Sequence, residues 1–166
     1  ACYGRGGVDA TVTDASVVLG YINPERFAGG ELALDAEAAE EAVTRVAGAL
    51  GLSPTAAAAG IHTILNARMA DEIRLVSVQR GYDPRDFGLV ALGGGGPVHG
   101  GALTLELDLA RMIVPEAPGV LSAFGLLVSD VEFEQVATLS GRAARVDEEQ
   151  VAHTLSELER QGAERM

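Results

Sequence analysis

Hydrophobic and polar positions recur along the chain in patterns that predict mainly helices, with short strands between them. Apolar residues at helical spacing follow Asp35 as far as Leu50, and Gly51 ends that helix. Ser53-Pro54 is an N-cap followed by proline at the first helical position, which predicts a long helix up to about Arg80. The apolar stripe of this long helix is Ile61, Leu65, Met69, Ile73 and Val76.

The middle of the chain has the pattern of a strand, a glycine turn, a helix and a second strand. Residues 87–92 form a short continuous apolar run, typical of a buried parallel strand. Four glycines follow at 93–96, then a helix over about 98–107 and a second strand over 111–114. This order predicts a βαβ unit. The fold class is therefore α/β, with long helices packed on a small mixed sheet.

The two ends of the chain are patterned less clearly. Near the start, Asp14 is a possible cap for a short helix over 15–19. Towards the end, the small-residue segment 118–127 predicts a short helix, and the imperfect alternation of 131–139 predicts a strand. Residues 147–165 predict an acidic amphipathic helix with Val151, Leu155 and Leu158 on one side.

Composition and charge narrow the possible functions. The chain has 166 residues, 48% apolar and 22% charged, enough for one domain or a large part of one. Its net charge of −12 argues against nucleic acid and against an acidic membrane surface. All 12 basic residues are Arg, which excludes a Walker-type lysine or a Schiff base in this segment. One cysteine favours a reducing cytoplasm, and a start without Met reads as an excerpt from a longer protein.

The glycine run Gly93–Gly96, followed by Pro97, is the strongest candidate for a binding site. Backbone without Cβ atoms lets a ligand approach closely, and a helix N-terminus offers free N–H groups. The spacing does not match Gly-x-Gly-x-x-Gly, and the missing lysine excludes a Walker loop. A tight turn required only for packing is the alternative interpretation of the same residues.

Five other residues have side chains that can do chemistry. Asp14 and His99 are candidate catalytic residues, with a helix cap and a satisfied histidine as the alternatives. Arg5, among glycines, is a candidate for binding a substrate anion, or else it pairs with a nearby carboxylate. Cys2 and His62 are interpreted as structural. No residue of this chain is assigned to a metal.

Four segments of the chain stand in a recognisable order and spacing. They are Cys2–Gly7 with Thr11–Ala15, Arg80–Phe87, Leu92–His99, and Val114-Pro115 with Pro118-Gly119, Ser122-Ala123 and Gly125–Leu127. Together they resemble the hydantoinase A / 5-oxoprolinase family, which includes subunits of acetone and acetophenone carboxylases. The resemblance covers residues 1–135, and 136–166 then begin a following segment. Gly95 departs mildly from the family pattern, which often has Ala there.

The resemblance implies the C-terminal part of an actin-like, ribonuclease-H-like ATPase domain that uses ATP with Mg²⁺. Gly93–Pro97 matches the family's adenosine-side turn, whereas the hairpins that hold phosphate are absent from these 166 residues and are expected N-terminal to them. The implied reaction opens hydantoin or 5-oxoproline by phosphoryl activation of the amide carbonyl, with a B-type partner subunit or domain. The fragment alone is then expected to be inactive. The alternatives are a ketone carboxylase subunit and a non-catalytic actin-like module.

Overall fold

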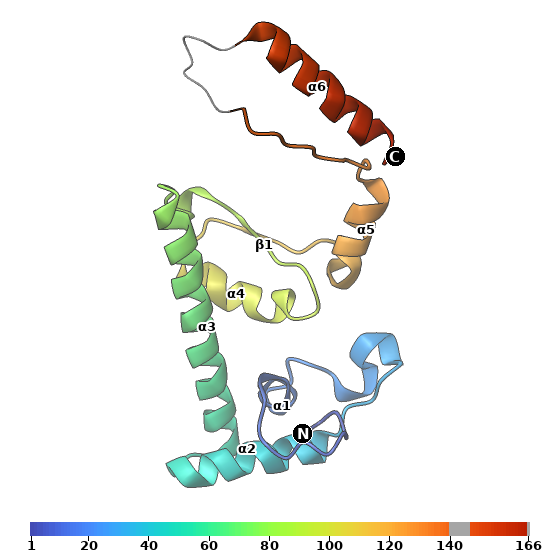
Figure 1. The fold of residues 1–166 in the computed structure, drawn as a ribbon. Helices are drawn as coiled ribbons and strands as arrows, with labels where there is room; N and C mark the ends of the chain where they lie inside the picture. The colour runs from blue at the N-terminus through green and yellow to red at the C-terminus, as the bar shows by residue number, and fades with distance from the viewer. Residues whose placement is uncertain (140–146, 166) are drawn as a thin grey trace. The chain divides into compact units, whose positions relative to one another are not determined.

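The computed structural model describes residues 1–139 and 147–165, and it divides into two compact units, Ala1–Ser122 and Ala123–Met166 (Figure 1). The first unit begins with the helices α1 (Val12–Val18), α2 (Ala36–Leu50) and α3 (Pro54–Gln79). The expected bounds of α2 and α3 are confirmed, with Asp35 and Ser53 as N-caps and Gly51 left-handed after α2. The short 3-10 segment η1 (Pro24–Gly30) lies in the loop between α1 and α2.

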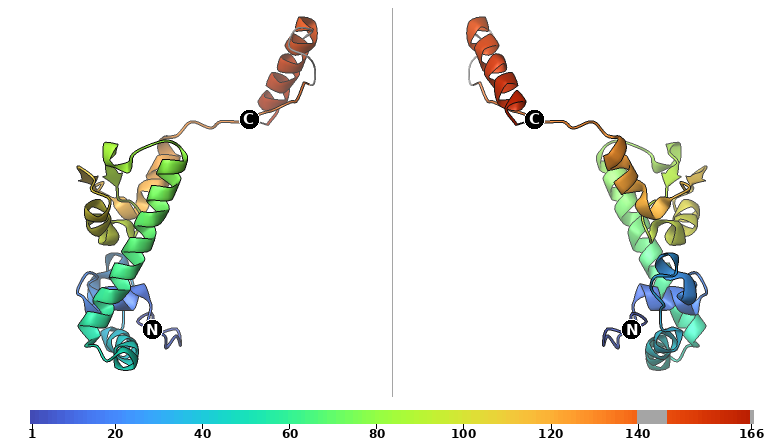
Figure 2. Two further views of the ribbon diagram at one scale, coloured as in Figure 1. Left: turned by 90° about the vertical axis from the view of Figure 1, so that its left-hand side faces the viewer. Right: turned by 90° about the vertical axis from the view of Figure 1, so that its right-hand side faces the viewer.

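The long helix α3 connects two separate cores within the first unit (Figure 2). At its N-terminal end it packs with α1 and α2 around a small cluster of Ala15, Val43, Ala47, Ala57 and Ala58. Further along, Ala70 packs with Leu103 and Leu107 of the helix α4 (Gly96–Glu106) and its C-terminal flank. With 26 residues, α3 is about 39 Å long, so it can join both cores.

The predicted stripe of α3 is displaced by one position from the face that is most deeply buried. The buried residues are Ala57, Ala58, His62 and Ala70, whereas Val76 from the predicted stripe is exposed. The partners differ along the helix: Ala15 of α1 packs with Ala57 and Ala58, whereas Leu103 and Leu107 pack on Ala70. Alanines let the partner approach closely, so they fill the contact and the larger side chains of α3 flank it.

The predicted βαβ unit is present, with a two-stranded parallel sheet rather than a mixed one in the described part of the chain. Strand β1 (Leu89–Val90) pairs with β2 (Met112–Ile113), in the register Leu89 to Met112 and Val90 to Ile113. Both strands are shorter than expected, although Ala91 N also donates to Ile113 O. Helix α4 connects them, and the 3-10 turn η2 (Pro84–Asp86) precedes β1.

The terminal segments correct two expectations. The first helix begins at Val12 with Thr11 as its N-cap, so Asp14 lies in the first turn and is not the cap. The one short helix expected over 118–127 is present as α5 (Leu121–Val128), preceded by the 3-10 turn η3 (Pro118–Val120). The expectation of a strand over 131–139 is wrong. Phe133 and Gln135 lie instead against the last helix, where no strand edge offers ladder hydrogen bonds.

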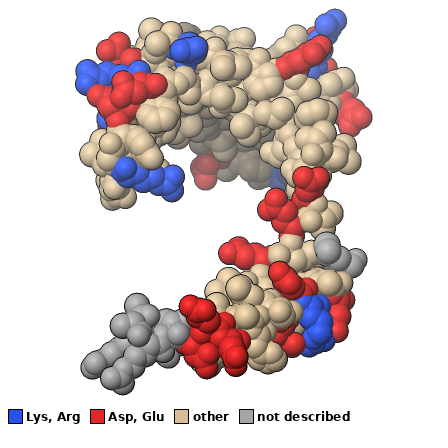
Figure 3. Space-filling view, turned by 90° about the horizontal axis from the view of Figure 1, so that it is seen from above, with Lys and Arg blue, Asp and Glu red and all other residues tan. Residues whose placement is uncertain are grey.

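The second unit contains the predicted acidic helix, α6 (Glu148–Ala163). Asp147 caps it, and within α6 Glu148, Glu149, Glu157 and Glu159 outnumber the single Arg160. On the face seen in Figure 3, acidic side chains of this unit outnumber basic ones. A Cβ placed on Gly162 of α6 would lie 4.0 Å from Gln135 Cγ, so the segment around Gln135 packs against α6 at this glycine. No helix in the described residues is long and apolar enough to cross a membrane.

Candidate functional site

A cavity of about 290 Å³ in the first unit brings the glycine turn together with the N-terminal segment. The cavity is lined on one side by the glycine turn and the start of α4 and on the other by α1 and the residues that flank it. The lining residues are Tyr3, Val12, Thr13, Ser16, Ile22, Phe27, Gly94, Gly95, Val98 and His99. Two of the four segments that suggested the family, one near the start of the chain and one near its middle, therefore meet at a single cavity.

The glycines of the turn differ in what they do. Gly93 has a φ of 77°, a left-handed conformation that favours glycine, and its N–H donates to Pro118 O over 2.8 Å. A Cβ on Gly96 would approach the Ala91 carbonyl carbon to 3.3 Å, so glycine allows close packing on the residue that follows β1. Gly94 and Gly95 have neither constraint: their φ angles are not left-handed, and a Cβ on either would meet open space.

No steric reason within the described part of the protein requires glycine at positions 94 and 95 of the turn. Both line the cavity, so a side chain there would project into space that the protein itself does not use. A turn needed only for packing explains Gly93 and Gly96 but leaves these two positions unexplained. Close approach of a ligand to the backbone is a reason that would apply to both.

The N-terminus of α4 is also free of side-chain capping. Gly95 is the N-cap residue and has no side chain to donate or accept, and Pro97 follows at the start of the helix. Pro97 has no N–H and Val98 N donates to Gly95 O over 3.1 Å, so among the first-turn amides of this 11-residue helix Gly96 N–H is the one without a partner in the described residues. This end of the helix favours an electron-rich group on a ligand.

The opposite side of the cavity is aromatic. Tyr3 and Phe27 form an edge-to-face pair with ring centroids 5.9 Å apart, and both line the cavity. Aromatic walls beside a few polar groups are typical of sites for small planar ligands. The volume lies near the lower end of the range of about 300–1,000 Å³ for ligand pockets, so it suits a nucleoside-sized group better than a whole triphosphate.

His99 lies at the cavity and belongs to a polar cluster that the sequence did not predict. It stacks on His62 with ring centroids 5.0 Å apart and planes at 23°, and Asn66 Oδ1 lies 2.8 Å from His99 Nδ1. His62 in turn lies 2.9 Å from Ser16 Oγ. Burial lowers the pKa of both histidines, and for His62 the neighbouring His99 lowers it further, so both rings are neutral at pH 7.

Asp14, the other candidate catalytic residue, is placed as a structural anchor. Its side chain is fully buried and completes a capping box with Thr11. Its oxygens accept hydrogen bonds from the backbone nitrogens of Cys2 and Thr11, each over 2.7 Å, and from Thr11 Oγ over 2.7 Å. Burial opposes the charge, but these bonds outweigh it and hold the pKa of Asp14 well below its usual range.

The remaining candidates near the chain start are not assembled into a reactive site. Burial, reinforced by the hydrogen bond to Asp14, raises the pKa of Cys2 to about 11, so its sulfur is a thiol at neutral pH. Arg5 is exposed and lines a separate shallow hollow with Ala1, Tyr3 and Gly7. The described residues contain no cluster of three or more His, Cys, Asp or Glu side chains able to hold a metal ion.

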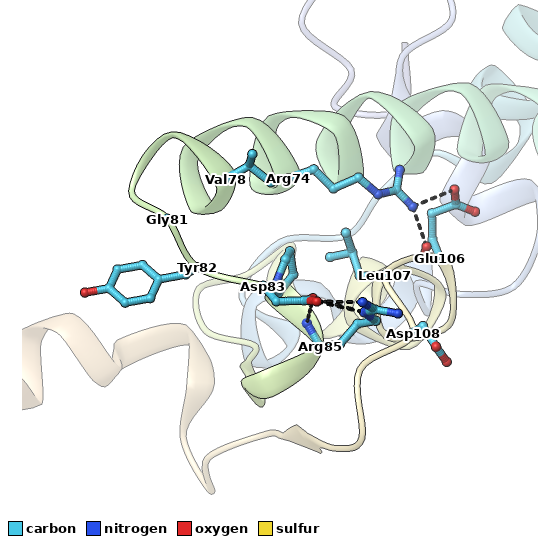
Figure 4. A pocket seen from close by; sticks show the side chains of 10 residues that line it. Arg74, Val78, Gly81, Tyr82, Asp83, Arg85, Glu106, Leu107 and Asp108 are labelled. Atoms are coloured by element: carbon cyan, nitrogen blue, oxygen red, sulfur yellow. Dashed lines mark hydrogen bonds and ion pairs between the residues drawn. The ribbon is translucent and has the colours of Figure 1, made fainter.

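A larger cavity of about 680 Å³ lies between the ends of α3 and α4, but its two arginines already pair with other groups (Figure 4). Arg74 donates to the Glu106 carbonyl oxygen over 2.6 Å, at the C-terminal end of α4. Arg85 folds back on Asp83 through three hydrogen bonds and lowers the pKa of that carboxyl to about 2. Since both guanidinium groups already have partners, this cavity has the character of a structural joint.

Comparison with known proteins identifies the family. A model described as Hydantoinase/oxoprolinase (Hydantoinase_A) matches residues 1–135. The chain belongs to the hydantoinase/oxoprolinase family. The resemblance suggested by the sequence is therefore confirmed, and the glycine turn, the N-terminal segment and the histidine pair all lie inside the matched range.

Individual members of the hydantoinase/oxoprolinase family cover most of this chain. The caprolactamase subunit alpha of Pseudomonas jessenii is 41% identical over 164 residues, which are 97% of this chain and 24% of that protein. The acetophenone carboxylase gamma subunit of Aromatoleum aromaticum is 43% identical over 131 residues, or 78% of this chain and 18% of that protein. The chain therefore spans about a quarter or less of the length of these relatives.

Solved structures of the family share this fold. A nucleotide-free structure of acetone carboxylase, from a study of ATP-dependent acetone carboxylation, superimposes with a TM-score of 0.79 at 33% identity, covering 99% of this chain and 24% of that one. The ATP-dependent caprolactamase of Pseudomonas jessenii superimposes with a TM-score of 0.72 at 41% identity, covering 98% of this chain and 24% of that one. The helical architecture with its small parallel sheet is thus that of known members.

Proposed function

We propose that this chain supplies the adenosine side of an ATP site in an enzyme that opens a cyclic amide. One observation carries the proposal: Gly94 and Gly95 line the cavity although neither backbone conformation nor packing requires glycine there. The aromatic pair on the facing wall and the uncapped N-terminus of α4 support it. Residues 1–135 would form the C-terminal part of an actin-like ATPase domain, and residues 136–166 would begin a following segment.

ATP would provide the phosphoryl group that converts an unreactive amide carbonyl into one open to attack by water. This chain's own residues would bind and orient the adenosine portion: Gly94 and Gly95 through backbone contact, and Tyr3 with Phe27 as an aromatic wall. No lysine is available here for the phosphates, and we assign no Mg²⁺ ligand to the described residues. Phosphate and metal binding would therefore be the work of segments outside this chain.

The cyclic-amide substrate class is supported by the relatives. The caprolactamase subunit matches 97% of the chain, and 5-oxoprolinase 1 of Arabidopsis thaliana is 31% identical over 147 residues. Relatives named as alpha, beta and gamma subunits suggest that a partner subunit, which we propose to be of the B type, completes the site. We place the reaction in the cytoplasm because the chain's one cysteine is a buried thiol.

Carboxylation of a ketone is a second candidate function, favoured by a specific observation. The acetone carboxylase structure has a TM-score of 0.79, and the acetophenone carboxylase subunit is 43% identical over its matched region. An adenosine site is common to both reactions, so the cavity described here does not distinguish between them. A non-catalytic actin-like module is the third possibility and would keep the same cavity.

One assay on the full-length protein with its partner subunit separates the three candidates. Phosphate release from ATP is measured with 5-oxoproline, hydantoin or caprolactam, and separately with acetone or acetophenone plus bicarbonate. Release that depends on a cyclic amide supports the proposal, whereas release that depends on ketone and bicarbonate replaces it with the carboxylase. ATP binding without either release identifies the non-catalytic module, and no ATP binding refutes the nucleotide site altogether.

A further inference from the structure

The stacked pair of His62 and His99 connects three helices directly beside the proposed adenosine cavity. His62 belongs to α3 and His99 to the first turn of α4, while Ser16 of α1 and Tyr21 contact the far side of His62. Only 5% of His62 and 8% of His99 is exposed. In a neutral imidazole one ring nitrogen carries the hydrogen and donates, and the other accepts. The neighbours of each ring show which nitrogen is which.

The hydrogen bonds of Ser16 determine the tautomer of His62. Ser16 Oγ donates its single hydrogen to Val12 O over 2.8 Å, as a serine in a helix often does. The same oxygen lies 2.9 Å from His62 Nε2, so it accepts the Nε2–H of His62. His62 is therefore the Nε2–H tautomer, with its donor used inside the protein.

Asn66 determines the tautomer of His99 in the same way. Asn66 Oδ1 lies 2.8 Å from His99 Nδ1 and can only accept, so Nδ1 carries the hydrogen. The neutral ring then has its lone pair on Nε2. Within residues 1–139 and 147–165, Nε2 of His99 has no hydrogen-bond partner, and no polar side-chain atom there is both sealed from solvent and unpaired. That nitrogen is therefore an accessible acceptor on a residue that lines the cavity.

The surroundings keep His99 in this neutral form. The groups that face the histidine pair are Ser16 from α1, Asn66 from α3 and Tyr21 from the loop after α1, and none of them carries a charge at pH 7. Each histidine is the other's titratable neighbour, and a charge on one disfavours a charge on the other. No described carboxylate forms a hydrogen bond or ion pair with either ring.

We propose that Nε2 of His99 accepts a hydrogen bond from an N–H or O–H group of the adenosine bound in the cavity, with Asn66 as the residue that positions it. This assignment rests on the proposed ATP site and makes His99 a specificity-determining residue of that site. Adenosine offers two kinds of donor, the 6-amino group of the base and the hydroxyl groups of the ribose. A ligand that presents only acceptors at this place would leave Nε2 unpaired or repelled.

A comparison of protein variants with nucleotide analogues tests the hydrogen bond. The full-length wild type and His99→Phe are titrated with ATP, with purine riboside triphosphate, which lacks the 6-amino group, and with 2′-deoxy-ATP and 3′-deoxy-ATP. We expect the wild type to bind one analogue about 10-fold more weakly than ATP, because one hydrogen bond is lost. His99→Phe should bind ATP and that analogue equally, whereas His99→Gln, which keeps an amide acceptor, should retain part of the discrimination. The analogue that shows the effect identifies the donor.

Asn66→Asp tests the role of His99 through the pH dependence of ATP binding, which would not change if His99 were purely structural. A carboxylate beside Nδ1–H favours the imidazolium form of His99, which donates at Nε2 instead of accepting. Weaker ATP binding should therefore set in at a higher pH in Asn66→Asp than in the wild type. Asn66→Gln is the uncharged control and should leave the position of the pH profile unchanged.

The outcomes distinguish this inference from the proposed function. If the wild type binds no ATP, the nucleotide site itself is refuted and the inference with it. If it binds ATP but every analogue is discriminated to the same extent by the wild type and by His99→Phe, only the acceptor role of His99 is refuted. An unchanged pH profile in Asn66→Asp would overturn the positioning role of Asn66.

Discussion

Three glycine-to-alanine variants within one turn and one helix separate ligand contact from packing. Gly94→Ala places a methyl group in the cavity, Gly100→Ala places one between α4 and the sheet, and Gly101→Ala places one in open space on the same helix. At Gly100 the new Cβ would lie 2.5 Å from Met112 Sδ and 3.1 Å from Ala91 Cβ. At Gly94 and Gly101 it would meet no atom within 4 Å.

The expected free energies follow from these distances. In a helix, alanine is favoured over glycine by about 1 kcal/mol, so Gly101→Ala should stabilise by about that amount. Gly100→Ala gains the same term but loses about 1–3 kcal/mol to overpacking, so it should be less stable than Gly101→Ala by that margin. Gly94→Ala should leave the fold unchanged or stabilise it by about 0.4–1 kcal/mol, because its backbone conformation suits alanine.

Binding should show a different order from stability. A methyl group pressed against adenosine costs on the order of 1–3 kcal/mol, which weakens ATP binding by about 5- to 150-fold in Gly94→Ala. Gly101→Ala should bind ATP as the wild type does. Thermal unfolding and isothermal titration of the full-length variants measure both quantities. If Gly94→Ala bound ATP as tightly as Gly101→Ala, the argument that an open glycine marks ligand contact would be wrong.

Three further predictions concern groups that hold the site in place. Burial lowers the pKa of His62 and His99 below 6.5, so as the pH falls the unfolded chain takes up protons before the folded one does. The stability that the two histidines contribute should therefore be complete above pH 6.5 and be lost as the pH drops through their lowered pKa values. Thermal midpoints between about pH 8 and pH 5 measure this, and a flat profile contradicts it. Asp14→Asn places an amide N–H₂ against the backbone N–H groups of Cys2 or Thr11 and should destabilise the fold by on the order of 3 kcal/mol. A denaturant titration measures this, with Asp9→Asn as the exposed control. Arg74→Met removes the contact with the Glu106 carbonyl and should lower the free energy of unfolding by no more than about 1 kcal/mol, because the side chain is half-exposed. Arg68→Met on the same helix is the control, and equal unfolding temperatures for the two variants would show that the contact contributes nothing.

The sequence predicted those parts of the fold that depend on local chemistry. Asp35 and Ser53 cap their helices as expected, and the βαβ order placed the glycine turn correctly between β1 and α4. The same local reasoning failed at Thr11, because a threonine and an aspartate three residues apart form a capping box and either one looks like the cap. It also failed over 131–139, where alternation alone cannot supply a neighbouring strand.

The candidate site was predicted only where its residues are adjacent in sequence. The glycines and His99 are close together and were recognised, but Asn66 and Ser16 reach the cluster across 33 and 46 positions of the chain. Their arrangement depends on how far α3 is rotated against α1 and α4, which the displaced apolar stripe shows cannot be read from hydrophobicity alone. A signal was present, since His62 and Asn66 are polar residues one turn apart on an alanine-rich helix.

The placement of His62 and Asn66 explains why one long helix serves both walls of the cavity. His62 bonds to α1, whose Thr13 and Ser16 line one side, and Asn66 bonds to His99 at the end of the glycine turn on the other side. Because the two residues lie one turn apart on α3, about 6 Å along its axis, the rigid helix holds the two walls at a fixed separation. The spacing of the cavity is thus determined by a helix that does not line it, and the cavity can remain open without side chains filling the glycine turn.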